Sequence, residues 1–519
     1  MKQTHQTPKT TTQSRVNTLT RIGGMIALFA FALPAQAQLT WDGGGNNVNW
    51  LDADNWVGDD APDTAGEDVL LDGNITVLLD PANGTTLDIG SLTIENGSTF
   101  NNRFDSGTLN VTGGLSNSGI LSHTSSPSNN ARTVYFNISG TGQTFNTSTG
   151  VINLGSNSGR NRINSIMTLD ANNQNDGAIN ASQTSSVDRD TIRFRLENSG
   201  TFTNNGTIFI QDTQPSTSSY TQFQVFTASS AVTLGGTGSV TLDLGTGADT
   251  ARARIVGNGT TSTLTNGSNH TIDGEGLVGG GSLNVVNDGL MHATGDTGVL
   301  DLNTDTFFTN NAGGRLVASG VAGMNIGAAS ETFLNNGLME SRSGSSINIL
   351  TSNSTINGTI AGGGSFTATT FSLSGSATLE AGDLSNADGT GTSTVGSLDF
   401  TGDLALADTT ILNFQLGDNS AAGISFDTIN ASGALTLDGV LNVQDLAGFG
   451  AGTYRLFTFS SGNLTDNGMT LGTTPGAYTY SIDANDAGGF VDLTVIPEPS
   501  TFVLILGSFG LLYWSRKRR

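Results

Sequence analysis

The feature that most limits how this chain can fold is a turn phrase that returns at a nearly fixed interval. The phrase joins Asn or Asp residues to a Gly and an apolar residue, as in Asn204-Asn205-Gly206-Thr207-Ile208 and Asn287-Asp288-Gly289-Leu290. Successive turn glycines are 22, 24, 24 and 21 residues apart at Gly267, Gly289, Gly313, Gly337 and Gly358. Asn and Gly tolerate the backbone angles of tight corners, and a period of roughly 20–25 residues fits one coil of a solenoid.

Short β-type runs fill the space between these turns. Examples are Ile75–Leu79, Thr207–Ile210 and Ser239–Leu244, whereas segments with helical periodicity do not occur between Leu39 and Ile496. A single repeat of this kind cannot bury its apolar residues, so the repeats must stack. We therefore predict an all-β chain whose residues 69–394 form a right-handed parallel β-helix.

The two ends of the repeat region differ from its middle. Residues 38–68 contain three of the four tryptophans, Trp41, Trp50 and Trp56, and we interpret this segment as an N-terminal cap. Residues 395–495 contain more regular strands, such as Ile411–Leu416, in which Leu412, Phe414 and Leu416 share one face. We predict a β-rich cap here that covers the last open coil edge, with a hairpin turn at Asp438-Gly439.

The charge of the chain is strongly acidic. It has 20 Lys and Arg against 44 Asp and Glu, for a net charge of −24. Eight basic residues lie before residue 22 or after residue 515, which leaves 20 − 8 = 12 in the body, all of them Arg. Such a body repels phosphate backbones, so we exclude nucleic acid as a partner. Cysteine is absent, which excludes disulfides and thiolate chemistry.

The N-terminus has the layout of a secretory signal peptide over residues 1–37. A basic segment up to Arg21 precedes the apolar run Ile22–Leu33, and Ala35-Gln36-Ala37 follows the small-x-small cleavage rule. We predict cleavage after Ala37, so that the mature chain begins at Gln38. The apolar run is too short to favour an uncleaved membrane anchor.

The C-terminal segment 496–519 combines three features in a fixed order. Pro497-Glu498-Pro499 precedes an apolar run over 501–514, and the chain closes with the basic residues Arg516, Lys517, Arg518 and Arg519. The apolar run and its basic stop predict a short transmembrane helix with its basic end in the cytoplasm. Because the run is short for a stable span, we expect a transient anchor.

This arrangement resembles the PEP-CTERM sorting signal. The resemblance covers about the last 25 residues. It implies processing by an exosortase-type protease near Pro497-Glu498-Pro499. It also implies a Gram-negative source that makes extracellular polysaccharide, and delivery through the inner membrane to the cell surface or matrix.

The repeats are similar to the passenger regions of autotransporters and of filamentous-haemagglutinin-like adhesins. Phe202-Thr203-Asn204-Asn205-Gly206-Thr207-Ile208 and Phe333-Leu334-Asn335-Asn336-Gly337-Leu338 carry this resemblance. It implies a β-helical fold and an adhesive or structural role. No outer-membrane barrel follows the repeats in this sequence, so the PEP-CTERM route replaces self-secretion in our interpretation.

Catalytic and metal-binding motifs are missing from the sequence. His123, His270 and His292 have no metal-ligand spacing, and we expect surface or corner positions for them. We predict no cofactor, no metal site and no catalytic residue. The alternative is a polysaccharide lyase or hydrolase, whose carboxylate pair would come from different coils. The best local cluster is Asp188-Arg189-Asp190 near Arg193 and Arg195, which we interpret as outward charges beside an inward Phe194.

Two other binding hypotheses rest on the N-terminal segment. Its acidic residues suggest a weak Ca²⁺ site that stiffens the protein, although their spacing is not that of an EF-hand. These acidic residues are Asp52, Asp54, Asp59, Asp60, Asp63, Glu67 and Asp68. The faces of Trp41, Trp50 and Trp56 are suited to stacking on sugar rings, and the alternative is that they seal the end of the solenoid. The sequence as a whole favours a non-enzymatic, exported surface or matrix protein that associates with exopolysaccharide.

Overall fold

The computed structural model describes residues 38–45, 48–104, 106–125, 132–155, 163–183, 190–213, 219–245, 252–259, 261–420 and 425–498. These residues belong to one compact unit, which is almost entirely β-sheet with a single three-residue 3₁₀ helix, η1 (Ala53–Asn55). The all-β prediction is therefore confirmed. The predicted signal peptide (1–37) and the predicted transmembrane helix (501–514) lie outside the described residues. Within the described ranges, no helix is long and apolar enough to cross a membrane.

The described strands form two sheets, which we call sheet 1 and sheet 2. Sheet 2 has sixteen strands, one in each coil: β3 (Thr76–Leu79), β5 (Thr99–Phe104), β7 (Ile120–Ser125), β10 (Val151–Gly155), β13 (Ala178–Gln183), β16 (Thr207–Asp212), β19 (Ser239–Asp243), β22 (Thr271–Gly274), β25 (Leu290–Ala293), β28 (Arg315–Ala318), β31 (Leu338–Ser341), β34 (Thr359–Gly362), β36 (Thr378–Ala381), β38 (Ile411–Leu416), β41 (Val440–Asp445) and β44 (Thr470–Leu471).

Sheet 1 has thirty strands, and most coils contribute two of them or one long bent strand: β1 (Leu39–Thr40), β2 (Val69–Leu71), β4 (Thr85–Ile94), β6 (Gly107–Asn117), β8 (Arg132–Ile138), β9 (Thr144–Asn146), β11 (Ile163–Asp170), β12 (Gln174–Asn175), β14 (Thr191–Glu197), β15 (Gly200–Asn204), β17 (Tyr220–Val225), β18 (Ala231–Gly235), β20 (Ala253–Gly257), β21 (Ser262–Asn266), β23 (Gly276–Gly279), β24 (Leu283–Asn287), β26 (Leu300–Asn303), β27 (Phe307–Asn310), β29 (Met324–Ile326), β30 (Thr332–Asn335), β32 (Ser346–Ile349), β33 (Asn353–Ile356), β35 (Ser365–Ser372), β37 (Ser397–Ala405), β39 (Thr428–Ala431), β40 (Leu435–Leu437), β42 (Gly452–Thr458), β43 (Leu464–Asp466), β45 (Tyr478–Asn485) and β46 (Phe490–Pro497).

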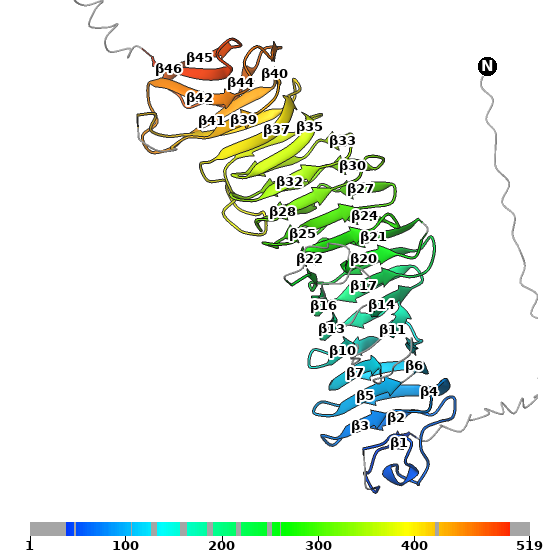
Figure 1. The fold of residues 1–519 in the computed structure, drawn as a ribbon. Coiled ribbons are helices and arrows are strands. Elements are labelled where there is room, and N and C mark those ends of the chain that lie inside the picture. Colours follow the sequence, from blue (N-terminus) through cyan, green and yellow to red (C-terminus); the bar gives the residue numbers. More distant parts are fainter. Residues whose placement is uncertain are drawn as a thin grey trace, which may run out of the picture. The chain divides into compact units, whose positions relative to one another are not determined.

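The strands stack in parallel from one coil to the next, which is the arrangement of a β-solenoid. In sheet 2, β13 pairs in parallel with β10 on one side and with β16 on the other. In sheet 1, β14 pairs in the same way with β11 and β17. Figure 1 shows the strands following one another in chain order along the stack.

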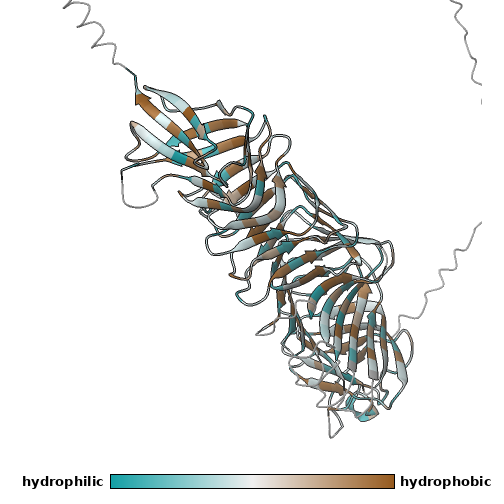
Figure 2. Cartoon of the chain, turned by 45° about the horizontal axis from the view of Figure 1, so that its top comes forward, coloured by the Kyte–Doolittle hydropathy of each residue, from teal (hydrophilic) through white to brown (hydrophobic). Residues whose placement is uncertain are grey.

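The core lies inside the coils, because side chains alternate between the two faces of each strand. Leu412, Phe414 and Leu416 of β38 are buried, while Asn413 and Gln415 between them are partly exposed. The same alternation appears as changing hydropathy along the strands in Figure 2. Each fully buried large apolar side chain contributes about 1.5–3 kcal/mol to the stability of the fold.

A column of glycines marks the corner that precedes sheet 2. The strand registers align nine glycines in this column: Gly119, Gly150, Gly177, Gly206, Gly238, Gly289, Gly314, Gly337 and Gly358. A methyl group on any of them would overlap an oxygen of the neighbouring coil. All five glycines named from the sequence lie in turns, but the column position belongs to Gly314 rather than Gly313, and to His270 rather than Gly267. The extra residues in those two turns shift the column position away from the expected glycine.

A ladder of buried asparagines runs beside the glycine column. Each side-chain amide nitrogen donates to the amide oxygen one coil further on, over 2.7–2.8 Å, in the series Asn117, Asn146, Asn175 and Asn204 and again in the series Asn266, Asn287, Asn310 and Asn335. These hydrogen bonds satisfy polar groups that would otherwise be buried without partners.

His270 bridges the one interruption in this ladder, between Asn204 and Asn266. The intervening coil places Leu234 opposite Asn266 and so has no amide at that position. His270 Nε2 lies 3.0 Å from Asn204 Nδ2, and its Nδ1 lies 2.8 Å from Asn266 Oδ1. Because the Asn204 amide nitrogen can only donate, the network assigns Nε2 as the acceptor and Nδ1–H as the donor of a neutral ring.

The two ends of the stack are built differently from its middle. At the N-terminal end, Trp50 and Trp56 are fully buried and Trp41 is 8% exposed. At the C-terminal end, β46 pairs antiparallel with both β42 and β45, which ends the parallel order. The hairpin predicted at Asp438-Gly439 is wrong: β40 and β41 belong to different sheets, and Gly439, with φ 95°, turns the chain around a corner between them.

Candidate functional site

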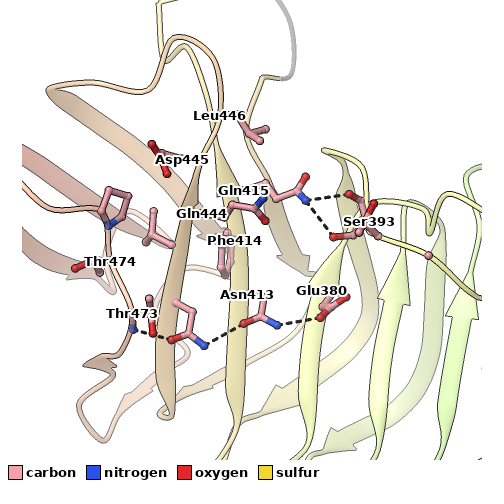
Figure 3. A pocket seen from close by; sticks show the side chains of 15 residues that line it. Glu380, Ser393, Asn413, Phe414, Gln415, Gln444, Asp445, Leu446, Thr473 and Thr474 are labelled. Atoms are coloured by element: carbon pink, nitrogen blue, oxygen red, sulfur yellow. Dashed lines mark hydrogen bonds between the residues drawn. The ribbon is translucent and has the colours of Figure 1, made fainter.

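A groove of about 870 Å³ with both polar and apolar lining residues opens on the outward face of sheet 2 near its C-terminal end. The floor of the groove comes from β38 and β41, and Glu380 of β36 borders it (Figure 3). The polar or charged side chains in its lining are Glu380, Thr392, Ser393, Asn413, Gln415, Asn442, Gln444, Asp445, Thr473 and Thr474.

Strand alternation places these amides on the outside. Because Phe414 is directed into the core, its neighbours Asn413 and Gln415 face the groove. The register then aligns Asn413 with Glu380 on one side and with Asn442 on the other. A continuous row of amide and carboxylate groups therefore crosses three coils.

Hydrogen bonds order this row. Asn413 Nδ2 donates to Glu380 Oε1 over 2.9 Å, and Asn442 Nδ2 donates to Asn413 Oδ1 over 3.1 Å. The backbone N–H of Thr473 donates to Asn442 Oδ1 over 2.8 Å and closes the row (Figure 3). Each of the two amides still has an N–H available for a ligand, since a primary amide carries two.

One wall of the groove is the long connection between β36 and β37, residues 382–396, which we call the side loop. Gln415 Nε2 donates to Ser393 O over 2.9 Å, which joins the groove floor to this loop. Arg315 of β28 forms an ion pair of 3.0 Å with Asp388 of the loop. Arg342 Nη1 donates to the carbonyl oxygens of Leu384 and Asn386. The side loop is thus fixed to coils that precede it in the chain.

The groove does not have the carboxylate geometry of a glycosidase. Glu380 and Asp445 lie two strands apart, about 9.6 Å, and three residues apart along the strand direction, about 10 Å, so their backbones are roughly 14 Å from each other. Figure 3 shows the two side chains at opposite ends of the groove, separated by Asn413 and Gln415. Glycosidase carboxyl pairs lie about 5–9.5 Å apart. The groove offers hydrogen-bonding groups but no paired acid and base.

A buried carboxyl group under the side loop makes the stability of this region depend on pH. Glu340 of β31 has no exposed surface, accepts a hydrogen bond from Leu384 N over 2.9 Å and pairs with Arg342 over 3.0 Å. Burial raises its pKa to about 7, against the lowering effects of the Leu384 hydrogen bond and of Arg342.

We expect Glu340→Gln to become more stable relative to the wild type as pH rises. The folded state keeps a proton that the unfolded chain loses between pH 4.5 and about 7, so wild-type stability falls across this window. The relative gain should be on the order of 2–3 kcal/mol between pH 4.5 and pH 8, measured by urea unfolding. Asp408→Asn, which removes an exposed charge, is the control. Parallel pH curves for the wild type and Glu340→Gln would contradict this account.

The tryptophans selected for sugar stacking lie in the core. Trp56 contacts Trp41 and Trp50 edge to face, with ring centroids 5.1 and 4.9 Å apart, and Trp50 also contacts Phe100. The indole nitrogen of Trp50 donates to Pro62 O, and that of Trp56 donates to Trp50 O. This burial argues against stacking on a sugar and fits the alternative, in which the three rings close the end of the solenoid.

The other residues selected from the sequence are dispersed. His123 is fully buried inside β7, so the expected surface or corner position is wrong for it, whereas His270 is buried but lies at the corner that precedes β22. Burial lowers the pKa of each to about 4. His292 is partly buried and lies 2.8 Å from Ser319 Oγ. Phe194 is buried between the partly exposed Arg193 and Arg195, as expected. Asp188 and Arg189 lie outside the described residues.

The acidic N-terminal stretch makes its own hydrogen bonds. Glu67 Oε2 accepts from the backbone N–H groups of Asp63 and Thr64, and Asp68 Oδ1 accepts from Ser91. Across the part of the chain that the structure describes, no group of three or more His, Asp or Glu side chains is placed to hold a metal ion. Calcium binding stays a prediction.

The sorting residues lie at the boundary of the described chain. Gln38 is its first residue, and Pro497 and Glu498 are exposed at its end. Ala35, Ala37, Pro499, Arg516, Lys517, Arg518 and Arg519 lie outside it. The groove was not predicted, because its residues come from separate coils and become neighbours only through the strand register.

Comparison with known proteins identifies one similar adhesin. No family model matches the chain. An 88-residue part, 16% of the chain, is 44% identical to the protein named adhesin BmaC autotransporter of Brucella suis biovar 1 (strain 1330). The match spans 2% of the length of that protein. This similarity supports the autotransporter-like character of the β-helical body.

Proposed function

We propose that this protein is exported to the cell surface or extracellular matrix, where it has an adhesive or structural role and associates with polysaccharide. The observation that carries the proposal is the similarity of part of the chain to an autotransporter adhesin. The long parallel stack supports it, because a solenoid presents an extended polar surface rather than an enclosed cavity. We expect the coils to be right-handed.

The route we propose begins with signal cleavage after Ala37 and ends with PEP-CTERM sorting. The helix at 501–514 would hold the chain transiently in the inner membrane until an exosortase-type protease cuts near Pro497-Glu498-Pro499. Two features of the fold support access to this tripeptide. Strand β46 ends at Pro497, and the side chains of Pro497 and Glu498 are exposed, while the Glu498 backbone N–H donates to Ala477 O.

We assign the groove of Figure 3 as a polysaccharide contact. Its amides and hydroxyls provide donors and acceptors on one face, which suits a ligand rich in hydroxyl groups. Its two charged side chains, Glu380 and Asp445, are both acidic and disfavour an anionic sugar at this place. The ligand that fits the groove is therefore a neutral polysaccharide.

The groove is tested with the double variant Asn442→Ala/Gln444→Ala in the full chain. Losing two ligand hydrogen bonds should weaken binding to a neutral glucan by roughly tenfold in affinity electrophoresis. Asn180→Ala is the matched control, because Asn180 also faces outward from sheet 2 and bonds a neighbouring amide, Asn153, outside the groove. Equal affinity of the double variant and the control would contradict the assignment.

A further inference from the structure

A second polar cluster lies on sheet 1, where β14, β17 and β20 occupy successive coils (Figure 1). Its arginines are partly exposed, and the two glutamines between them are buried. The register places Arg193 opposite Gln222 and Gln222 opposite Arg254, while Arg195 lies opposite Gln224. Three arginines and two glutamines thus form a compact grid, which we call the arginine patch: Arg193, Arg195, Gln222, Gln224 and Arg254.

The three guanidinium groups are held in place by aromatic rings and amides. The Arg254 guanidinium lies 3.6 Å from the centre of the Tyr220 ring, and that of Arg195 lies 4.2 Å from the centre of the Phe226 ring. Arg193 Nη2 donates to the Tyr220 hydroxyl over 3.0 Å. The Nε atoms of Arg195 and Arg254 donate to Gln224 and Gln222 over 2.9 and 3.0 Å. Since a guanidinium has five N–H donors, each of the three keeps donors that no described residue occupies.

Four other arginines of the described chain have a carboxylate partner, whereas the three arginines of the patch have none among the described residues. Arg103, Arg315, Arg342 and Arg455 each form an ion pair. Arg193, Arg195 and Arg254 form no ion pair with a described residue. From a longer distance, the negative charge of Glu197 raises the pKa of Arg195, and that of Asp212 raises the pKa of Arg254. Three cations without an ion pair to a described residue are unexpected in a chain of net charge −24.

The patch is also electrostatically unfavourable as it stands. Burial, followed by the charge of Arg193, lowers the pKa of Arg195 to about 10. Burial also lowers the pKa of Arg254, and the charge of Arg193 acts in the same direction. Like charges that are partly removed from water repel one another, and an oxyanion bound between them relieves this repulsion.

We propose that the arginine patch binds the carboxylate or sulfate groups of an anionic polysaccharide, at a site separate from the groove. Arg193 and Arg195 are about 7 Å apart along their strand, and Arg193 and Arg254 are about 10 Å apart across the coils. Charges that repeat along one polymer can engage such a grid at several points. The choice of a polysaccharide rests on the proposed function, and the acidity of the surrounding body argues against nucleic acid.

The test measures binding of the full chain to polygalacturonate, dextran sulfate, neutral dextran and DNA. Arg193→Gln/Arg195→Gln should weaken binding to polygalacturonate, dextran sulfate or both by roughly tenfold or more, with dextran binding unchanged. Arg455→Gln removes the same type of charge from an exposed ion pair and is the control. If the double variant fails to fold, Arg195→Gln alone replaces it. Melting curves establish which variants are folded.

Binding to one acidic polymer and not the other identifies the carboxylate or the sulfate as the ligand group, and either result supports the proposal. The proposal is overturned if the double variant binds acidic polysaccharide as tightly as Arg455→Gln does, or if only DNA is bound. The groove variant Asn442→Ala/Gln444→Ala should keep acidic binding, so failure of the groove assignment is distinguishable from failure of this one.

Discussion

Gly337→Ala is expected to destabilise the solenoid by about 3 kcal/mol or more, or to prevent its folding. Gly337 lies in the glycine column, where a methyl group would overlap the backbone oxygens of Gly314 and Asn311. Backbone oxygens of a stacked coil cannot rotate away as a flexible side chain can. The change therefore forces neighbouring coils apart, and urea unfolding measures the loss.

Gly476→Ala is the matched control for this prediction. A methyl group added at Gly476 has no atom within 4 Å, and Gly476 does not require a positive φ. The free energy of unfolding of the Gly476→Ala protein should therefore differ from that of the wild type by less than about 0.5 kcal/mol. A Gly337→Ala protein as stable as Gly476→Ala would show that the coils are not packed as closely as the structure indicates.

His270→Leu is expected to lower stability by about 2–3 kcal/mol at pH 8. Leu has a similar volume but cannot accept from Asn204 or donate to Asn266, so two buried amide groups lose a partner. Asn204 Nδ2 keeps a second hydrogen bond to Ser239 O, which limits the loss at that end. The volume match separates the effect of the hydrogen bonds from that of a cavity.

The cost of His270→Leu should shrink as pH falls. Burial lowers the pKa of His270 to about 4, so the unfolded chain takes up a proton between pH 6.5 and 4 that the folded chain excludes. Wild-type stability is lost across this window, by about 3 kcal/mol from this residue, and the Leu variant has no such loss. His123 is unchanged in both proteins. The difference in the free energy of unfolding between the wild type and His270→Leu should therefore change with pH. A difference that stays constant from pH 8 to pH 4.5 would contradict the buried, neutral state of His270.

The coil period and the inward faces of the strands were predictable because they are local patterns. The spacing of Asn-Gly turns indicated stacked coils, and alternation placed Leu412, Phe414 and Leu416 on one buried face. The turn at Asp438-Gly439 shows the limit of local patterns. The same dipeptide serves a hairpin or a solenoid corner, and only stacking on the preceding coil decides between them.

The sites were not predictable because they depend on register between coils. Asn413 and Glu380 are 33 residues apart, and Arg193 and Arg254 are 61 apart, yet each pair lies on adjacent or next-adjacent strands. The turn from Asn310 is two residues longer than the turn from Asn287, so the column position follows Asn310 by four residues, at Gly314, rather than by two. A single sequence does not indicate which residues an insertion displaces, so side-chain neighbours across coils could not be assigned from it.

The most direct test of the proposed function is retention of the full chain on exopolysaccharide from the producing organism, with the chain length of the eluted sugar measured. An adhesive or structural protein is expected to be retained and to leave the polysaccharide at its original length. Shortening of the polysaccharide would contradict this account and indicate an enzyme, and absence of retention would contradict the association with polysaccharide.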